Sequence, residues 1–315
     1  MTLAAARDGD QDAFAELVRP HRRELRVHCY RMLASADDAD DALQETLLAA
    51  WRGLSGFEER SSLRAWLYRI ATNCCLRMAD QRKRRVLSWD HGPARSPDDD
   101  LGTPEEGPWV EPWVDPGAAY ERKETIGLAF VAALQHLPPN QRAVLILREV
   151  LDFPAAEVAE LLDTSVPSVN SALQRARQTV AARAPDREEQ SVAVVAEQER
   201  SVLAGFVDAF ERRDVDALVS LLAADVRFTM PPLPAWFDGR DDVGGFFERR
   251  VFATPWRALP VEVNGQPAFA CYQEVGGTFR LSALNVLTIE DGEITWIASF
   301  LDPAWLGRLD LPATL

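Results

Sequence analysis

Hydrophobic residues recur at helical spacing through two stretches of the chain, about 10–85 and 120–183, and alternate with polar residues further on. In the first stretch Leu43, Leu47, Trp51 and Leu54 follow this spacing, so we expect them to face a core. The last third predicts helices at 202–210, 217–222 and 241–252, and strands at 226–230, 258–263, 268–273, 278–289 and 294–300. The pattern therefore predicts a multidomain chain, with two all-α domains followed by an α+β domain.

Two connecting segments separate these parts. Residues 86–119 are rich in Pro, Gly and Asp, which predicts an extended tether, and residues 184–191 form a second, short and charged connection. Trp109 and Trp113 are unusual in a free tether, because an exposed tryptophan normally rests on a surface. We therefore expect the segment around them to dock on a domain.

Composition narrows the class of protein. A length of 315 residues favours two or three domains, and 47% hydrophobic with 26% charged residues is typical of a soluble globular protein. No apolar run is long enough to span a bilayer, and the N-terminus lacks a signal pattern, so we expect a cytoplasmic protein. The four cysteines lack the spacing of metal ligands, which predicts buried, reduced thiols, no metal and no cofactor.

The net charge of −15 argues against a protein that coats nucleic acid indiscriminately, but it allows a local basic patch. Acids also cluster locally. Asp37, Asp41 and Glu45 recur every four residues, with Asp40 and Gln44 beside them. One interpretation is that these acids only complement the dipole of a helix. The other is an acidic face that docks a basic partner.

A basic run ends the next predicted helix, at Arg82-Lys-Arg-Arg85. Basic residues suit a helix C-terminus, but four in succession exceed what capping needs, so a phosphate-contacting patch is the better interpretation. Near these cations, a surface that holds unstacked bases is indicated by Phe57, Trp66, Tyr68 and Asn73. Tyr68 suits a core equally well, and for Trp66 a core position is favoured.

A helix-turn-helix is predicted at 154–180. Pro154 suits the first turn of one helix, Asp163-Thr-Ser165 forms the turn, and the second helix carries a core stripe spaced 3, 4, 3, 4. Its outward side chains combine hydrogen-bonding groups with arginines, as base edges and phosphates require. They are Ser168, Asn170, Ser171, Gln174, Arg175, Arg177 and Gln178. Many helical hairpins have a short turn, so this segment alone indicates DNA binding but does not identify the class of DNA-binding protein.

Taken in order, these segments resemble the extracytoplasmic-function (ECF) subfamily of sigma-70 RNA polymerase sigma factors. Asp37-Asp-Ala-Asp-Asp-Ala-Leu-Gln-Glu45 resembles the core-polymerase-binding segment, and Trp66-Leu-Tyr-Arg-Ile-Ala-Thr-Asn73 resembles the segment that opens the −10 element. Leu137-Pro-Pro-Asn-Gln-Arg142 and Ser168-Val-Asn-Ser-Ala-Leu-Gln-Arg-Ala-Arg177 resemble the domain that reads the −35 element. Family members often carry Arg or Lys where Asn170 stands, which puts the −35 sequence read by this chain in doubt.

The resemblance implies domains at 1–85 (sigma region 2) and 120–185 (sigma region 4), joined by the linker at 86–119. It implies core polymerase, through its β′ clamp and β subunits, and promoter DNA as partners, with no membrane. The implied polymerase-binding residues are Asp37, Asp40, Asp41, Gln44 and Glu45. The implied −10 residues are Phe57, Arg60, Asn73, Arg77, Arg82, Lys83, Arg84 and Arg85. The implied −35 residues are Ser168, Asn170, Ser171, Gln174, Arg175 and Arg177.

The part at 194–315 resembles a SnoaL-like (NTF2-like) cone domain. Such cones often enclose a pocket, and the candidate lining residues, whose aromatic members suit a core equally, are Trp236, Phe237, Tyr272, Asn285, Trp296 and Asp302. No histidine follows His136, so the His/Asp pair of enzymatic relatives cannot form, and we predict no enzyme. Some ECF factors carry such a domain in place of a separate anti-sigma protein, and Trp109-Val-Glu-Pro-Trp113 is similar to their linker motif. We therefore expect regulation through intramolecular contacts of this domain and the linker with the sigma domains.

Two other classes of function stay open. One is a stand-alone helix-turn-helix repressor that senses a ligand through the C-terminal domain. It leaves the acidic face and the 57–73 segment without a use. The other is a SnoaL-like enzyme with an Asp or Glu base, which the missing histidine disfavours.

Overall fold

The computed structural model describes residues 3–59, 61–113, 127–181 and 192–315 and separates into two compact units. The helical unit comprises described residues of 1–85 and 130–185, and the sheet unit comprises those of 86–129 and 186–315. Both predicted helical parts thus fall in one unit. The described part of the linker belongs to the other unit, together with the C-terminal domain.

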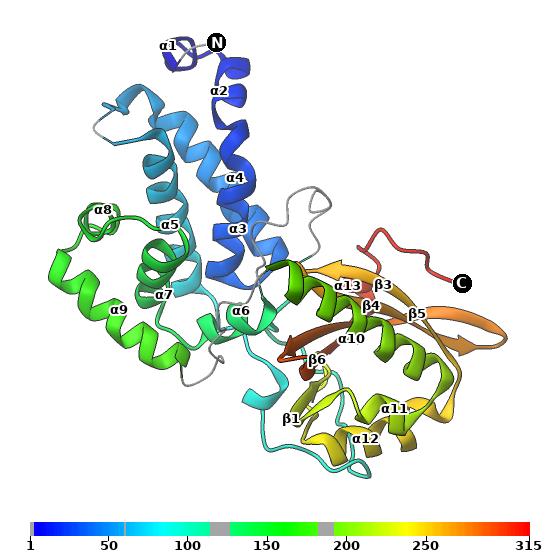
Figure 1. Ribbon diagram of the computed structural model, residues 1–315. Helices are drawn as coiled ribbons and strands as arrows, with labels where there is room; N and C mark the ends of the chain where they lie inside the picture. Colours follow the sequence, from blue (N-terminus) through cyan, green and yellow to red (C-terminus); the bar gives the residue numbers. More distant parts are fainter. Residues whose placement is uncertain (1–2, 60, 114–126, 182–191) are drawn as a thin grey trace. The chain divides into compact units, whose positions relative to one another are not determined.

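The first part of the helical unit is a bundle (Figure 1). Its helices are α1 (Leu3–Arg7), α2 (Gln11–Val18), α3 (Arg22–Leu33), α4 (Ala36–Gly53) and α5 (Leu63–Gln81). Asp10, Ser35 and Ser62 each accept a hydrogen bond from the amide three residues on, which fixes the starts of α2, α4 and α5. Fully buried Leu25, Tyr30 and Leu67 lie in the core of this bundle.

The second part of the helical unit contains the predicted helix-turn-helix. Its elements are α6 (Leu128–Gln135), whose first two residues belong to the sheet unit, α7 (Pro139–Leu145), a π-helical turn (Ile146–Val150), α8 (Ala155–Leu161) and α9 (Val166–Ala181). Val169, Leu173 and Ala176 of the predicted stripe on α9 are buried, whereas Val166 at its first turn is 38% exposed. Within this unit α7 packs against α3 and α5, and α8 packs against α5.

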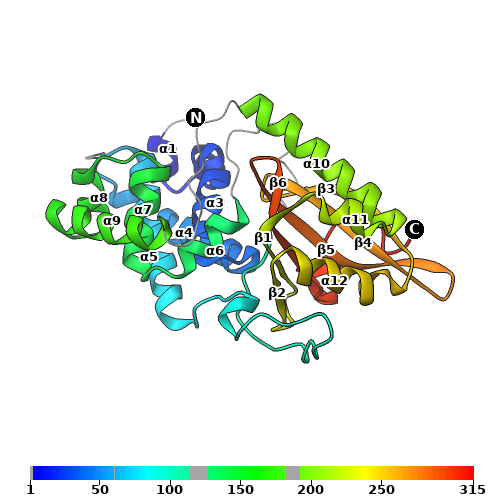
Figure 2. The same cartoon turned by 60° about the horizontal axis from the view of Figure 1, so that its bottom comes forward.

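The sheet unit is an α+β fold in which α10, α11 and α12 cover one face of a six-stranded sheet (Figures 1 and 2). Its helices are α10 (Val192–Arg212), α11 (Val215–Val219), α12 (Arg240–Arg249) and α13 (Pro303–Leu306). Its strands are β1 (Leu222–Thr229), β2 (Trp236–Asp238), β3 (Trp256–Val263), β4 (Gln266–Val275), β5 (Thr278–Glu290) and β6 (Glu293–Phe300).

The strand order is β2-β1-β6-β5-β4-β3. Neighbouring strands are antiparallel except β1 and β6, which run parallel. The parallel pair arises because β1 precedes α12 and meets the last strand only after the chain has crossed the sheet. Between the sheet and its helices lie eight phenylalanines, Phe206, Phe210, Phe228, Phe237, Phe246, Phe247, Phe252 and Phe269.

Candidate nucleic-acid interface

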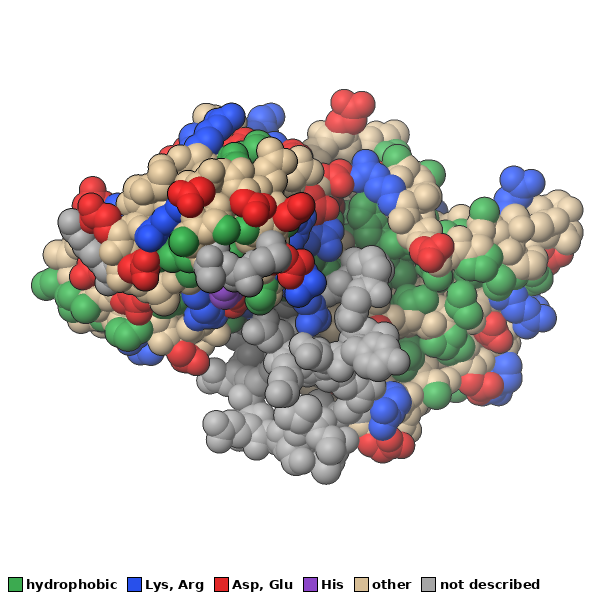
Figure 3. All heavy atoms as spheres, turned by 90° about the horizontal axis from the view of Figure 1, so that it is seen from above, with side chains coloured by type: hydrophobic (Ala, Val, Ile, Leu, Met, Phe, Trp, Pro, Cys, Tyr) green, Lys and Arg blue, Asp and Glu red, His purple; other side chains and the backbone are tan. Residues whose placement is uncertain are grey.

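The acidic face predicted on α4 is solvent-exposed. Asp37, Asp41, Gln44 and Glu45 are exposed and Asp40 is half-buried. Two of these acids meet arginines from other helices. The Arg26 guanidinium binds both carboxylate oxygens of Asp40, with Nη2 2.8 Å from Oδ2, and Arg77 Nη2 lies 2.7 Å from Glu45 Oε2. Figure 3 likewise shows acidic and basic side chains interspersed over the helical unit.

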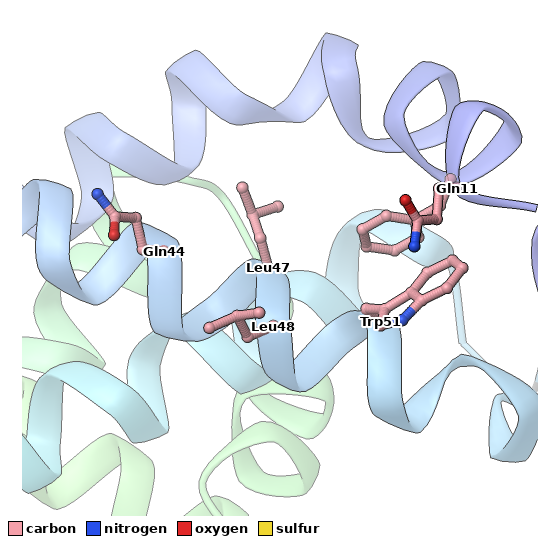
Figure 4. A pocket seen from close by; sticks show the side chains of 6 residues that line it. Gln11, Gln44, Leu47, Leu48 and Trp51 are labelled. Atoms are coloured by element: carbon pink, nitrogen blue, oxygen red, sulfur yellow. The ribbon is translucent and has the colours of Figure 1, made fainter. Parts of the chain in front are cut away.

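An apolar groove that the sequence did not indicate lies between α2 and α4 (Figure 4). It has a volume of about 500 Å³ and is lined by Gln11, Phe14, Gln44, Leu47, Leu48 and Trp51. Leu47 and Trp51 were expected to face a core, but both are half-buried at this groove, and Leu48 is 55% exposed. Phe14 and Trp51 meet edge to face, with ring centroids 5.1 Å apart. The wide apolar stripe of α4 therefore serves both a core and a surface groove.

The residues predicted for the −10 element occupy different environments. Phe57 is 7% exposed and packs on Trp66 with ring centroids 4.9 Å apart, whereas Asn73 and Arg77 on α5 are exposed. Arg60 lies outside the described residues. Asn73 and Arg77 are thus open to solvent, whereas the Phe57 ring belongs to a small core cluster.

The basic run after α5 is divided between two environments. Arg82 and Arg85 bind the carboxylate of Asp38, with Arg85 Nη2 2.7 Å from Asp38 Oδ2. Lys83 and Arg84 are exposed, and Arg84 Nη1 lies 2.9 Å from His136 Nδ1. Sequence reasoning missed Asp38, whose position three residues into α4 resembles that of an ordinary first-turn acid.

All six residues predicted to contact the −35 element are exposed on α9. The Ser165 hydroxyl accepts a hydrogen bond from the Ser168 amide at 3.3 Å, so Ser165, the last residue of the predicted turn, caps the start of α9. Arg177 Nη2 lies 2.5 Å from Glu149 Oε1, which means that a phosphate must compete with this carboxylate for Arg177. The spacing of the helix thus presents its polar stripe to solvent, as a recognition helix requires.

Further contacts join the first and second parts of the helical unit. The ring of Phe153, just before α8, packs against Tyr68 at 5.4 Å and lies 5.1 Å from the Arg64 guanidinium carbon. Arg142 on α7 is buried, and its guanidinium donates to the carbonyls of Leu134, Gln135 and Leu137 and to that of Met32 in α3. Burial lowers the pKa of Arg142 to about 10, so it stays charged at neutral pH.

In the sheet unit the predicted pocket residues do not share one cavity wall. Phe237 is buried and stacks on Phe246 at 4.5 Å, while Asp302 is exposed and caps α13. Trp236 and Trp296 lie against Trp89 of the linker, at 6.4 and 5.1 Å between ring centroids. The buried Tyr272 hydroxyl and Asn285 Oδ1 have no hydrogen-bond partner among the described residues.

The linker lies along the rest of the sheet unit and is hydrogen-bonded to it at several residues. Backbone bonds join Arg95 to Trp236 and Glu105 to Pro232, at 2.8 and 2.9 Å. Arg250 donates to the carbonyls of Pro97 and Asp99 at 3.1 and 2.9 Å. Trp109 and Trp113 are 8% and 2% exposed. The prediction that the segment around these tryptophans docks on a domain is confirmed.

The side chains that hold Trp113 of the linker and Leu128 at the start of α6 were missed by sequence reasoning. Asn264 and Gln266 flank Gly265 in the β3–β4 turn, and both are 4% exposed. Asn264 bonds with Trp113, and Gln266 Oε1 accepts from the Leu128 amide at 2.6 Å. Asn264-Gly265 is readable as a hairpin turn, but no sequence signal pointed to its distant partners.

None of the helices that the structure describes is both long and apolar enough to cross a membrane. In the same described part of the chain, no group of three or more His, Cys, Asp or Glu side chains is placed to hold a metal ion.

Three families match the chain in succession. Residues 17–85 match Sigma-70 region 2, residues 127–180 match Sigma-70, region 4, and residues 203–297 match the SnoaL-like domain. The ECF RNA polymerase sigma factor SigG of Mycobacterium tuberculosis (strain ATCC 25618 / H37Rv) is 40% identical over 323 residues, which cover 99% of this chain and 86% of SigG. SigM of the same strain is 32% identical over 179 residues, covering 57% of this chain and 81% of SigM.

A solved structure supports the fold. The crystal structure of the Mycobacterium tuberculosis extracytoplasmic function sigma factor SigJ matches with a TM-score of 0.65 and 22% identity, over 95% of this chain and 99% of that one.

Both sigma-70 regions, arranged before an α+β domain, define a sigma-type transcription initiation factor. The identity to SigG along nearly the whole chain shows that the chain belongs to the ECF RNA polymerase sigma factors, with a SnoaL-like domain at its C-terminal side. The resemblance and fold class inferred from the sequence are confirmed. Sigma factors bind core RNA polymerase and promoter DNA and are not themselves enzymes, so the chain is a DNA-binding transcription factor without catalytic activity.

Proposed function

We propose that the chain acts in the cytoplasm and binds core polymerase through the acidic face of α4. Asp37, Asp40, Asp41, Gln44 and Glu45 contact the β′ clamp, and region 4 contacts the β subunit. The support is electrostatic, because an exposed row of carboxylates favours a basic partner and speeds its association. The neighbouring apolar groove adds surface whose burial stabilises the complex.

In the same proposal, α5 and the basic run open the −10 element and α9 reads the −35 element. Exposed Asn73 and Arg77 supply polar and cationic contacts to a melted strand, and the Phe57 ring, released from its cluster, receives an extruded base. On α9, Asn170, Ser171 and Gln174 contact base edges. Arg175 and Arg177 contact phosphates.

We further propose that the SnoaL-like domain restrains the sigma factor by holding its linker. The observation that carries this proposal is that linker residues 86–113 belong to the sheet unit. Elements at −10 and −35 lie about 25 base pairs apart, which is on the order of 80 Å along the duplex. A free linker of about 34 residues could extend over roughly 110 Å. A linker held against the sheet unit cannot extend in this way, so promoter engagement requires its release.

Run-off transcription with core polymerase over fragmented genomic DNA tests this regulation. In the full-length chain, Asn264→Gly removes the side-chain acceptor that holds Trp113 and should raise transcript yield several-fold at the same start sites. The matched variant Asn264→Asp retains an acceptor oxygen and should behave as the unaltered chain. Removal of residues 197–315 should also change yield without changing start sites. Unchanged yield in both the Gly variant and the truncated chain would contradict the proposed restraint.

Charge reversal at Asp41 and Glu45 tests the polymerase surface. Asp41→Lys with Glu45→Lys should abolish binding to core polymerase in a pull-down assay while α9 still binds DNA. Asp12→Lys, an exposed acid on α2, is the control for a change in net charge. A stand-alone repressor would keep its function in the doubly reversed variant, so retained promoter-specific regulation without polymerase binding would favour that alternative.

A further inference from the structure

Asp38 holds a position unlike that of its acidic neighbours on α4. The Ser35 hydroxyl accepts a hydrogen bond from the Asp38 amide at 3.2 Å, which fixes the residue in the first turn of the helix. Its carboxylate side chain is only 11% exposed, whereas that of Asp41, one turn further on, is 62% exposed. The Asp38 carboxylate is thus an internal anion.

Two arginines of the basic run neutralise this anion. Arg82 Nη1 binds Asp38 Oδ1, and Arg85 Nη2 binds Asp38 Oδ2 at 2.7 Å, so each carboxylate oxygen has its own guanidinium. The Arg85 side chain is only 15% exposed, and that of Arg82 is 44% exposed, with its second Nη 4.0 Å from Asp41. Lys83 and Arg84, between them, are exposed.

A DNA phosphate must displace Asp38 to reach Arg85. That exchange would leave a nearly buried carboxylate without its charge partner, and breaking a buried ion pair from one side is strongly unfavourable. Lys83 carries no such penalty, and Arg84 is exposed and meets His136 at the surface rather than a buried carboxylate. The four cations that look equivalent in the sequence are consequently unequal in their ability to bind a phosphate.

We propose that Asp38 withholds Arg82 and Arg85 from nucleic acid, so that Lys83 and Arg84 supply the phosphate contacts of this run. Asp38 then limits sequence-independent binding, which rises with every phosphate neutralised, and leaves recognition to the groups that read bases. It is a specificity-determining residue that acts through the two arginines. The inference rests on the proposed contact between the basic run and the melted promoter strand.

The test measures how salt weakens binding of the full-length chain to a fluorescein-labelled single-stranded oligodeoxynucleotide of mixed sequence. For single strands, log K falls against log[KCl] by about 0.7 for each phosphate neutralised. Lys83→Gln and Arg84→Gln should each make the slope shallower by about 0.7, and Arg82→Gln with Arg85→Gln should leave it unchanged. Asp38→Asn should make it steeper by about 1.4, because two guanidiniums are released.

Two further variants separate this mechanism from a simple loss of negative charge. Asp12→Asn makes the same chemical change on α2, away from the basic run, and should leave the slope unaltered. The triple variant Asp38→Asn, Arg82→Gln, Arg85→Gln should return to the original slope, because the released cations are gone. A slope that stays steep in the triple variant assigns the effect to charge alone and overturns the proposal.

The remaining outcomes are also decisive. If Arg85→Gln alone flattens the slope as much as Lys83→Gln, or Asp38→Asn leaves it unchanged, Asp38 does not withhold the arginines. If Lys83→Gln and Arg84→Gln have no effect, or the chain binds no single-stranded DNA in any variant, the proposed −10 contact fails and this inference fails with it. Circular dichroism melts of each variant identify any change that comes from loss of the fold.

Discussion

Asn264 and Trp113, which are 151 residues apart, hold each other by two hydrogen bonds. The Trp113 amide donates to Asn264 Oδ1 at 2.7 Å, and the Asn264 amide donates to the Trp113 carbonyl at 2.9 Å. Asn264 has φ +58° and Gly265 has φ +70°, as a two-residue hairpin turn of this type requires. The turn that joins β3 and β4 therefore also binds the linker.

We predict that Asn264→Gly loosens the linker while keeping this turn, because glycine adopts a positive φ without strain. The loss of one buried hydrogen bond leaves the Trp113 amide without an acceptor and should lower local stability by about 1–2 kcal/mol. Hydrogen exchange of peptides covering residues 105–113 should speed up, while peptides from α4 keep their rates. Asn264→Asp retains the acceptor and should protect the linker as before. Equal exchange in the Gly variant and the original chain would show that Trp113 is held by other contacts.

The periodic parts of the fold were predictable from sequence because burial imposes a repeat. The stripe Val169, Leu173 and Ala176 identified the recognition helix, and alternation identified β3 to β6, since each follows its partner directly. The parallel pairing of β1 with β6 could not be predicted in this way, because nothing local marks strands that meet only after a crossover.

The partners of individual polar residues could not be predicted from the sequence. Composition predicted a tether, and its tryptophans predicted docking, but Asn264 and Gln266 find their partners 151 and 138 residues away. Likewise, Asp38 and Arg85 lie 47 residues apart, and only the packing of α4 against the end of α5 brings them together. A single hydrogen bond or ion pair depends on how two distant segments meet in the folded chain, and it produces no periodic pattern in the sequence.

Arg142 is predicted to be the most sensitive polar residue of the helical unit. Its guanidinium satisfies four backbone carbonyls, so Arg142→Met would leave buried acceptors unpaired and should lower the free energy of unfolding by about 3–5 kcal/mol. Urea denaturation followed by circular dichroism measures the change. Arg69→Met, on the exposed surface of α5, is the matched control and should change stability by less than about 0.5 kcal/mol. A small effect at Arg142 would mean that water replaces the guanidinium.

Asn170 and Arg175 are predicted to contribute to promoter binding in different ways. Asn170→Ala removes a base contact and should weaken binding to a recovered promoter by about 1–3 kcal/mol, with little change for random DNA. Arg175→Gln removes a phosphate contact and should weaken both, with the salt slope for duplex DNA shallower by about 0.9. Anisotropy titrations of holoenzyme on promoter and random duplexes separate the two effects. If Asn170→Ala weakens both duplexes equally, the residue does not read bases.

His28 should make the stability of the helical unit depend on pH. It is fully buried, its Nε2 lies 2.9 Å from Thr72 Oγ1, and burial, with the nearby charge of Arg31, lowers its pKa to about 3. In the unfolded chain this histidine has the ordinary pKa of about 6.5. Between pH 6.5 and 3 it therefore binds a proton in the unfolded state but not in the folded state. This contribution to stability is therefore complete above pH 6.5 and is lost progressively as the pH falls.

From pH 6.5 to 4.5 the loss should be on the order of 2 kcal/mol. His28→Gln retains a group that can bond Thr72 but cannot take up a proton. Urea denaturation of both proteins at a series of pH values gives the difference in their free energies of unfolding. The contributions of the carboxylates, which both proteins share, cancel in this difference. We expect this difference to change with pH only below about 6.5, in the direction that favours the Gln variant at acid pH. A constant difference across that range would show that His28 is protonated in the folded protein, and that the polar groups around it accept the charge.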